Sequence, residues 1–520
     1  MRVPRVVPPA RLLLLALAWL FRGDPANAAW HSQEEIPVES PVYRLVDDLA
    51  ASYPVNSALL LTRPWTRADL GRFIDQLTAD TPAAASDPAV LRLRRELAPA
   101  GGAAGLEPMF ASEQDDLSFE LSGYARTSYA EDRSRETVAR DHRVGLQGSL
   151  AFGERGLLFA DGYAGNVTPG AHGTPGRDGS FHSTDSEATA WFDRAYASWI
   201  TRGFSLRAGH TWLDWGPGSN GTLGLSDAAP AFDLIAASVA LPGDARLHWF
   251  VATLDAVGAS YLAGHRLAFR AGPAVEMSFT ELARFDGTGS VPLYLLPVVP
   301  YALFDRRVRG ASDLPADSLD KVGRNNVMYM MDFSWTWRPG TRLYGELLLD
   351  DATLDNSRPL AIGWQAGMHL RRLIGGAAWS LRGDYSRLYS YVYSTSHGQD
   401  FIHAGFPTGF PLGPDVDRFS ARLEWRADPA WGLGVEGSAA RKGSQPLGQA
   451  WQPGTPVRAR LVLSFPVDQD QRLALTADWS PSPSVAVSAA GGRAWAKSRN
   501  HVYRDDADGL YGRAQARFRW

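Results

Sequence analysis

The chain ends in GLYGRAQARFRW, residues Gly509 to Trp520. Alternate positions of this stretch hold small or apolar side chains: Leu510, Gly512, Ala514, Ala516, Phe518 and Trp520. The positions between them hold polar and mostly basic side chains: Tyr511, Arg513, Gln515, Arg517 and Arg519. Because successive side chains point to opposite faces of a strand, this pattern predicts a β-strand with one apolar face and one basic face.

The same two-residue period begins at Leu117 and recurs along the chain to its last residue. Tight turns such as Gly153 to Gly156 and Arg338 to Gly340 alternate with long connections near 213–229 and 393–416. An outer-membrane barrel combines short periplasmic turns, long external loops, lipid-facing apolar residues and a polar lumen. The sequence therefore predicts a mainly β protein in the outer membrane. We expect a transmembrane antiparallel barrel over 107–520, closed by pairing of the last strand with the first.

The number of strands is open between residues 441 and 484. Direct counting gives about nineteen strands, whereas bacterial single-chain barrels have an even number. We prefer about 18 strands, because Pro466 to Gln471 can be an irregularity rather than a true turn.

The start of the chain has the pattern of a cleaved secretory signal. Arginines at positions 2, 5 and 11 precede the apolar run Leu12 to Phe21, and Ala26-Asn27-Ala28 follows. We expect cleavage after Ala28, so that residues 1–28 form the signal peptide. After Ala28 no uninterrupted apolar run is long enough for a membrane-spanning helix.

Residues 29–106 are predicted to form a helical region. Pro41 suits the first turn of one helix, Thr66 to Asp69 resembles a capping box, and Asp87-Pro88 opens a third helix. The apolar stripes of these helices need a partner surface.

The composition excludes several kinds of site. The formal net charge is −4, which argues against a nucleic-acid partner. The absence of cysteine excludes disulfides, thiolate zinc sites and cysteine nucleophiles. We predict no cofactor, no metal site and no catalytic residue.

Two short stretches hold candidate glycan-binding residues. Trp212, Asp214 and Trp215 lie where an outward strand becomes an external loop, and Asp350 and Asp351 end a second outward strand. Tryptophan faces stack on sugar rings, and carboxylates accept hydrogen bonds from hydroxyls or bind cations. The alternative interpretation is structural: the tryptophans would belong to the ring of aromatic residues at the membrane interface, and the carboxylates would form ion pairs with arginines in the lumen.

The strand that ends in Asp350 and Asp351 does not suggest a glycosidase site. Glu346 and Asp350 share the lumen face about 13 Å apart, beyond the separation of about 5 to 9.5 Å that hydrolysis requires. The inward arginines of several strands favour ion-pair ladders with Glu120, Glu424 and Asp478. The alternative is a basic lumen that attracts an anionic polymer.

Several motifs together resemble the Wzi family of capsule-assembly outer-membrane proteins: Arg63 to Thr66, Gly209 to Gly218, Gly221 to Ser226, Leu343 to Asp351 and Gly413 to Asp417. The resemblance runs from about Ile36 to Trp520. It implies an 18-stranded barrel with an N-terminal periplasmic helical bundle. It also implies a lectin-like, non-enzymatic role in anchoring capsular or related surface polysaccharide.

Other expectations follow from this resemblance. The implied partners are surface polysaccharide, outer-membrane lipid and the barrel assembly machinery, which would recognise the terminal aromatic residue. The loop Phe401 to Phe410, rich in Phe, Gly and Pro, departs from the family pattern, so the identity of the polymer is not implied. The alternative function is an outer-membrane channel or porin for saccharides.

Overall fold

The structure is a computed structural model that describes residues 32–55, 58–97, 108–114, 116–167, 187–201, 203–255, 257–303, 325–351, 360–395, 398–449, 451 and 462–520. The predicted signal peptide, 1–28, lies outside these residues, and the domain boundaries after residues 28 and 106 stay predictions. Within the described ranges, no helix is both long and apolar enough to cross a membrane.

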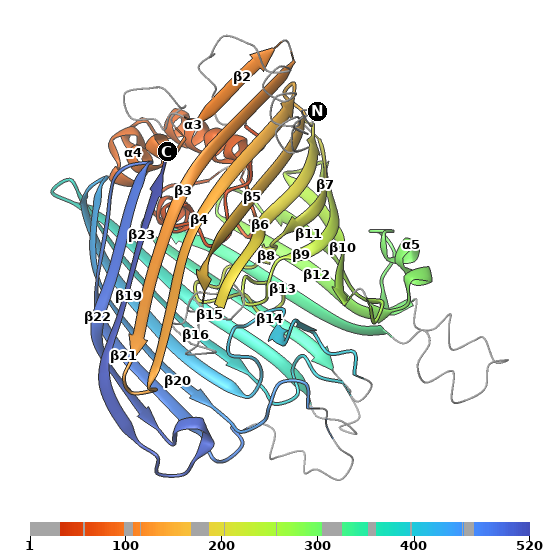
Figure 1. The fold of residues 1–520 in the computed structure, drawn as a ribbon, viewed down its shortest axis with the longest axis vertical. Coiled ribbons are helices and arrows are strands. Elements are labelled where there is room, and N and C mark those ends of the chain that lie inside the picture. The colour runs from red at the N-terminus through yellow and green to blue at the C-terminus, as the bar shows by residue number, and fades with distance from the viewer. Residues whose placement is uncertain are drawn as a thin grey trace, which may run out of the picture.

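In the described residues, 18 antiparallel strands form a closed barrel (Figure 1). The first nine in chain order are β3 (Leu117–Asp132), β4 (Thr137–Phe152), β5 (Gly156–Val167), β6 (Glu187–Ile200), β7 (Phe204–Thr211), β9 (Phe232–Leu241), β10 (Ala245–Asp255), β11 (Ser260–Arg270) and β12 (Val275–Asp286). The others are β13 (Asn325–Arg338), β14 (Thr341–Asp351), β15 (Ala361–Ile374), β16 (Ala377–Leu388), β19 (Val416–Asp428), β20 (Trp431–Lys442), β21 (Asp468–Ser482), β22 (Val485–Lys497) and β23 (Ala507–Arg519). A short strand, β2 (Phe110–Gln114), pairs with β3 alongside the ring.

The last strand closes the barrel against the first, as the sequence predicts. β23 pairs with β3 from Tyr511 opposite Asp132 to Arg519 opposite Tyr124. Beyond this ladder, Trp520 and Gly123 exchange two backbone hydrogen bonds of 2.9 and 2.7 Å. Leu510 is 61% exposed on the outer face, whereas Tyr511 is 4% exposed on the inner face. Closure satisfies the backbone groups of both terminal strands, which a hydrocarbon environment requires.

The expected count of 18 is confirmed for the described residues, and the structure describes two strands in the doubtful interval. β20 ends at Lys442, and β21 begins at Asp468 and continues unbroken to Ser482. Between these two strands, the described residues 462–465 form no strand. Residues 452–461 lie outside the described ranges.

The N-terminal helices lie inside one end of the barrel, which we call the helix end; the opposite end is the loop end. They are α2 (Val42–Ser52), α3 (Arg67–Asp80), the 3-10 turn η1 (Pro82–Ser86) and α4 (Pro88–Glu96). Thr66 and Asp69 form the predicted capping box of α3, and the Asp87 carboxylate caps α4. The described residues of 32–97 are called the helical plug. The C-terminus lies at this same end (Figure 1).

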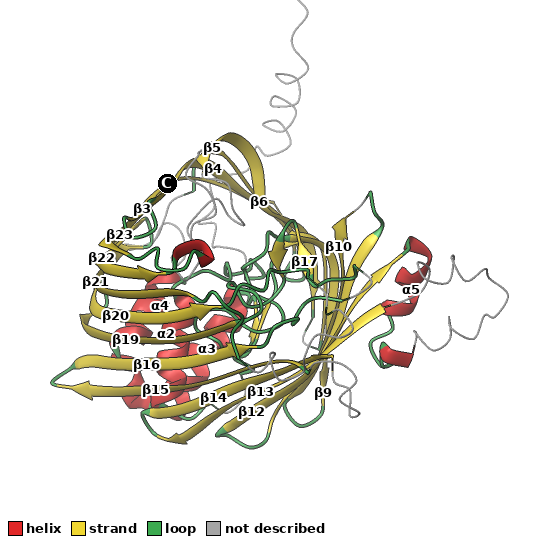
Figure 2. Cartoon of the chain, turned by 90° about the horizontal axis from the view of Figure 1, so that it is seen from below, coloured by secondary structure: helices red, strands yellow, loops and turns green. Residues whose placement is uncertain are grey.

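Two connections turn into the lumen from the loop end. We call residues 212–231, between β7 and β9, and 389–415, between β16 and β19, the inner loops. Viewed from the loop end, loops cross the interior of the ring (Figure 2). Apolar residues of the inner loops and of the strands form one buried core, which includes Trp215, Leu223, Leu225, Phe250, Leu348, Tyr393, Phe401 and Phe410.

Four elements complete the described connections. β17 (Ile402–His403) pairs with β18 (Phe406–Pro407) within an inner loop. The turn η2 (Thr288–Ser290) leads into α5 (Val291–Tyr294) between β12 and β13, and η4 (Arg499–His501) lies between β22 and β23.

Candidate functional site

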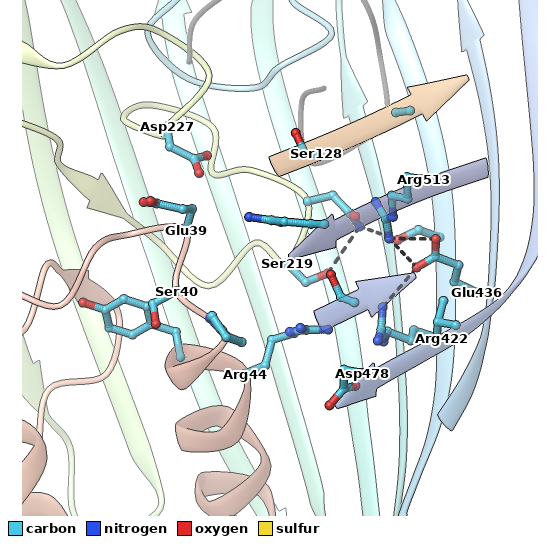
Figure 3. Close-up of a pocket in the computed structure, with 18 of the residues that line it drawn as sticks. Glu39, Ser40, Arg44, Ser128, Ser219, Asp227, Arg422, Glu436, Asp478 and Arg513 are labelled. Atoms are coloured by element: carbon cyan, nitrogen blue, oxygen red, sulfur yellow. Dashed lines mark hydrogen bonds and ion pairs between the residues drawn. The ribbon is translucent and has the colours of Figure 1, made fainter. Parts of the chain in front are cut away.

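A cavity of about 510 Å³ lies in the lumen between the helical plug and the inner loops. The plug contributes Glu39, Ser40 and Arg44, and an inner loop contributes Ser219 and Asp227 (Figure 3). The barrel wall contributes a further set of labelled residues: Ser128, Arg422, Glu436, Asp478 and Arg513. Elsewhere the wall is lined by short side chains, among them Ser438, Ala474 and Ser488, which leave this space unfilled.

The charged side chains of the wall are joined in ion pairs. Arg513 donates to both carboxylate oxygens of Glu436 at 2.8 and 2.9 Å, and Arg422 donates to Glu436 at 3.0 Å. Arg426 donates to Glu424 at 2.8 Å and to Asp478 at 2.9 Å. These contacts confirm the predicted ladders for Glu424 and Asp478. The arginines of this ladder are therefore compensated by carboxylates.

The helical plug is fixed to the barrel by buried polar contacts. Asp47 of α2 accepts hydrogen bonds from Arg342 at 2.9 Å and from Arg63 at 3.2 Å, and Arg382 lies 3.4 Å away. Burial acts to raise the pKa of the Asp47 carboxyl, but the three guanidinium groups outweigh it and hold that pKa well below its usual range. A second anchor joins Arg371 of β15 to the Asp87 carboxylate by hydrogen bonds of 2.7 and 2.8 Å.

The predicted tryptophan site connects the plug to an inner loop. β1 (Thr62–Arg63) of the plug pairs with β8 (Asp214–Trp215), and Asp214 lies 3.6 Å from the Arg63 guanidinium. Trp212, Asp214 and Trp215 are 6%, 0% and 3% exposed. The Trp212 indole donates to the Ala229 carbonyl at 3.1 Å. The three residues follow β7, as expected, but they are buried, because the loop that holds them folds inward.

Asp350 also holds an inner loop. Its carboxylate accepts a hydrogen bond of 2.6 Å from the backbone N–H of Tyr393, and the residue is 7% exposed. The Tyr393 hydroxyl donates to the Leu223 carbonyl at 2.5 Å and accepts from the Phe410 N–H at 2.9 Å. The side chain of Asp351 lies outside the described part of the structure. The described members of the predicted site thus organise the loops, and their glycan-binding role stays a prediction.

An exposed aromatic surface at the loop end was not among the predicted residues. Phe465 and Tyr503 are 71% and 59% exposed, and their ring centroids lie 5.6 Å apart. The Arg504 guanidinium lies 5.2 Å from the centroid of the Tyr503 ring. The two rings come from different connections, so local periodicity does not reveal their contact. Exposed rings beside a cation offer stacking and hydrogen-bonding groups to a sugar chain.

Hydrogen bonds hold this aromatic surface in place. The buried Asp415, from the Gly413 to Asp417 motif, accepts a hydrogen bond from the Ser464 N–H at 3.2 Å. His501 Nδ1 lies 2.9 Å from the Pro466 carbonyl oxygen, which ties the two connections together. Among the described residues, no group of three or more His, Cys, Asp or Glu side chains is arranged to hold a metal ion.

A family model described as capsule assembly protein Wzi matches residues 112–509. The chain resembles the solved structure of Wzi of Escherichia coli, an outer-membrane, carbohydrate-binding β-barrel involved in group 1 capsule assembly. That likeness has 15% sequence identity and a TM-score of 0.61, and it covers 93% of this chain and 99% of the other.

Two solved structures of Pseudomonas aeruginosa proteins, OccK5 and OprD, resemble the chain less. OccK5 is 9% identical with a TM-score of 0.43, covering 77% of this chain and 97% of its own. OprD is 11% identical with a TM-score of 0.41, covering 77% of this chain and 95% of its own. No curated protein matches the chain.

Proposed function

The chain belongs to the Wzi family of capsule-assembly outer-membrane proteins, and on that premise we propose that it anchors capsular or related surface polysaccharide at the outer face of the membrane. The observation that carries the proposal is the filling of the lumen from both ends, by the helical plug and by the inner loops. A barrel filled in this way is suited to present a surface rather than to pass solutes.

The alternative function, a channel for saccharides, would require an open lumen. A saccharide porin needs a continuous water-filled path, whereas here Arg63 of the plug lies 3.6 Å from Asp214 of an inner loop within the barrel. We therefore expect purified protein in planar bilayers to show little steady conductance. Large, stable openings would favour the channel.

We propose that the chain acts without catalysis. Wzi is not an enzyme family. The carboxylates of Glu436, Glu424 and Asp478 in the lumen are engaged by arginines, an arrangement that stabilises structure. Retention of a polymer requires binding alone.

We propose that the polymer contacts the aromatic surface formed by Phe465, Tyr503 and Arg504. Each such contact is weak, but a repeating chain meets many copies of the protein at once. Multiple attachment raises overall affinity by about 10² to 10⁴ over a single site. The predicted residues Trp212, Asp214, Trp215, Asp350 and Asp351 then support binding indirectly, by fixing the loops that surround this surface.

Direct binding tests the proposal. Purified protein in detergent is mixed with surface polysaccharide isolated from the producing strain, and the bound fraction is measured on an immobilised polymer. We expect binding by the native chain, a several-fold loss for Phe465→Ala with Tyr503→Ala, and retention for Tyr503→Phe, which keeps the ring. Absence of binding by the native chain would contradict the function, whereas unchanged binding by the double variant would contradict only the aromatic site.

The remaining partners are proposals as well. We propose that outer-membrane lipid surrounds the apolar outer face of the barrel. We also propose that β23, with Trp520 at its end, is the segment recognised by the barrel assembly machinery, because it must pair last to close the ring.

A further inference from the structure

The described part of the connection between β12 and β13 lies on the outside of the barrel, unlike the inner loops. This part, residues 287–303, contains η2 and α5 and projects beside β10 and β12 (Figures 1 and 2). Its buried residues pack on outward-facing side chains of the wall in one cluster: Val251, Ala263, Ala283, Phe285, Tyr294 and Tyr301. We call residues 287–303 the strap.

Aromatic stacking and hydrogen bonds fix the strap to the wall. The ring of Tyr294 stacks on Phe285 with centroids 3.7 Å apart and planes 7° apart. The Tyr301 hydroxyl donates to the Tyr294 carbonyl at 3.1 Å, and Asn325 at the start of β13 donates to the Tyr301 carbonyl at 2.9 Å. The strap is thus docked by specific contacts rather than by apolar burial alone.

Beneath the strap lies a polar pair on the lipid-facing side of the wall. His265 and Glu281 are opposite each other on β11 and β12, and their side chains lie 2.9 Å apart. Leu267 and Phe279 are two residues away from His265 and Glu281, so their side chains lie on the same face of the wall. They are 37% and 48% exposed there. Glu281 is five residues from the outer end of β12, or about 17 Å along the strand, a distance shorter than the apolar band of about 25 Å that is typical of such barrels.

The strap satisfies this carboxylate. The Glu281 oxygens accept hydrogen bonds from the backbone N–H groups of Tyr301 and Ala302, at 2.9 and 3.2 Å. Tyr301 also packs its ring against His265, with centroids 4.4 Å apart. As a result Glu281 is 5% exposed. A carboxylate facing hydrocarbon without such partners would carry a large free-energy cost.

The outer edge of the strap has the character of a lipid-facing surface. No charged residue occurs between Val291 and Leu303. Four of its apolar side chains are exposed: Leu293 at 41%, Leu296 at 48%, Val298 at 77% and Leu303 at 49%. This edge continues the apolar outer face of the neighbouring strands.

We propose that the strap is a membrane-inserted segment whose exposed edge contacts the acyl chains of the outer leaflet, while its inner edge seals the His265–Glu281 pair from lipid. Continuity with the apolar wall, the absence of charge and the satisfied polar pair all point to lipid as the occupant. This inference is independent of polysaccharide binding.

The lack of native cysteine allows a direct test. Val298→Cys, with Leu296→Cys as a second site, is labelled with a nitroxide and reconstituted in lipid bilayers. Collision rates with oxygen, which concentrates in lipid, and with a water-soluble nickel chelate are measured by electron paramagnetic resonance. Phe279→Cys serves as the lipid-facing control, and Val257→Cys, in the turn after β10 and 98% exposed, serves as the water-facing control.

We expect the oxygen-to-nickel ratio at both strap sites to equal that at residue 279 and to exceed that at residue 257 several-fold. A ratio like that of residue 257 would place the strap in water and overturn the proposal. Low collision with both reagents would also overturn it, because the edge would then be covered by protein. Crosslinking between Val298→Cys chains would identify that protein as a second copy.

Discussion

Replacing Tyr393 with phenylalanine should loosen the inner loops without altering the barrel. Tyr393 is 0% exposed, and its hydroxyl bonds both the Leu223 carbonyl and the Phe410 N–H. The variant keeps the ring but leaves these two buried backbone groups without their partner. Each orphaned group costs about 1–3 kcal/mol. At the lower limit, the free energy that opposes local opening of the inner loops falls by about 2 kcal/mol, which makes this opening about 30-fold more frequent.

Amide hydrogen exchange in detergent micelles measures this opening. We expect peptides covering 216–228 and 401–412 to lose about 30-fold in protection, while peptides of β19 to β23 keep theirs. Tyr503→Phe, on the exposed aromatic surface, is the matched control and should leave both loops unchanged. Unaltered exchange in both loops of Tyr393→Phe would refute the account of how the lumen is closed.

Three further outcomes follow from the fold. Trp215→Ala should lower the free energy of unfolding by about 3–5 kcal/mol, because the Trp215 ring packs edge-on against Phe250 in the buried core. On gels, the folded band should convert to the unfolded band at a lower temperature than in the native chain. An unchanged conversion temperature would contradict that packing. Deletion of Phe518 to Trp520 should lower the amount of folded barrel in the outer membrane, and normal amounts would count against closure by β23. An epitope tag at Gly405 should be accessible on intact cells and one at Pro339 should not; the reverse result would invert the orientation of the barrel.

Much of the fold could be predicted because barrel strands obey a local rule. The two-residue period identifies inner and outer faces, so the burial of Glu346 and Leu348 and the exposure of Leu510 follow from parity. Helix ends are local as well, and the capping box at Thr66 could be identified from its sequence. Direct counting of strands was uncertain only between residues 441 and 484, where the structure describes the two strands β20 and β21.

The candidate site could not be predicted because its contacts are distant in sequence. Parity indicated that Trp212 and Trp215 follow an outward strand, but not that the loop returns into the lumen to pair with Thr62 and Arg63. The same limit hid the contact of Phe465 with Tyr503. Each pair depends on where the chain turns after a strand ends, which periodicity does not encode.

The central claim, that this chain holds polysaccharide at the cell surface, is tested most directly by deleting it and measuring polymer in the cell-bound and medium fractions. The account predicts unchanged total polymer, with a shift from the cell surface to the medium that the native chain reverses. A normal surface layer in the deleted strain, or a halt in polymer synthesis, would contradict the claim.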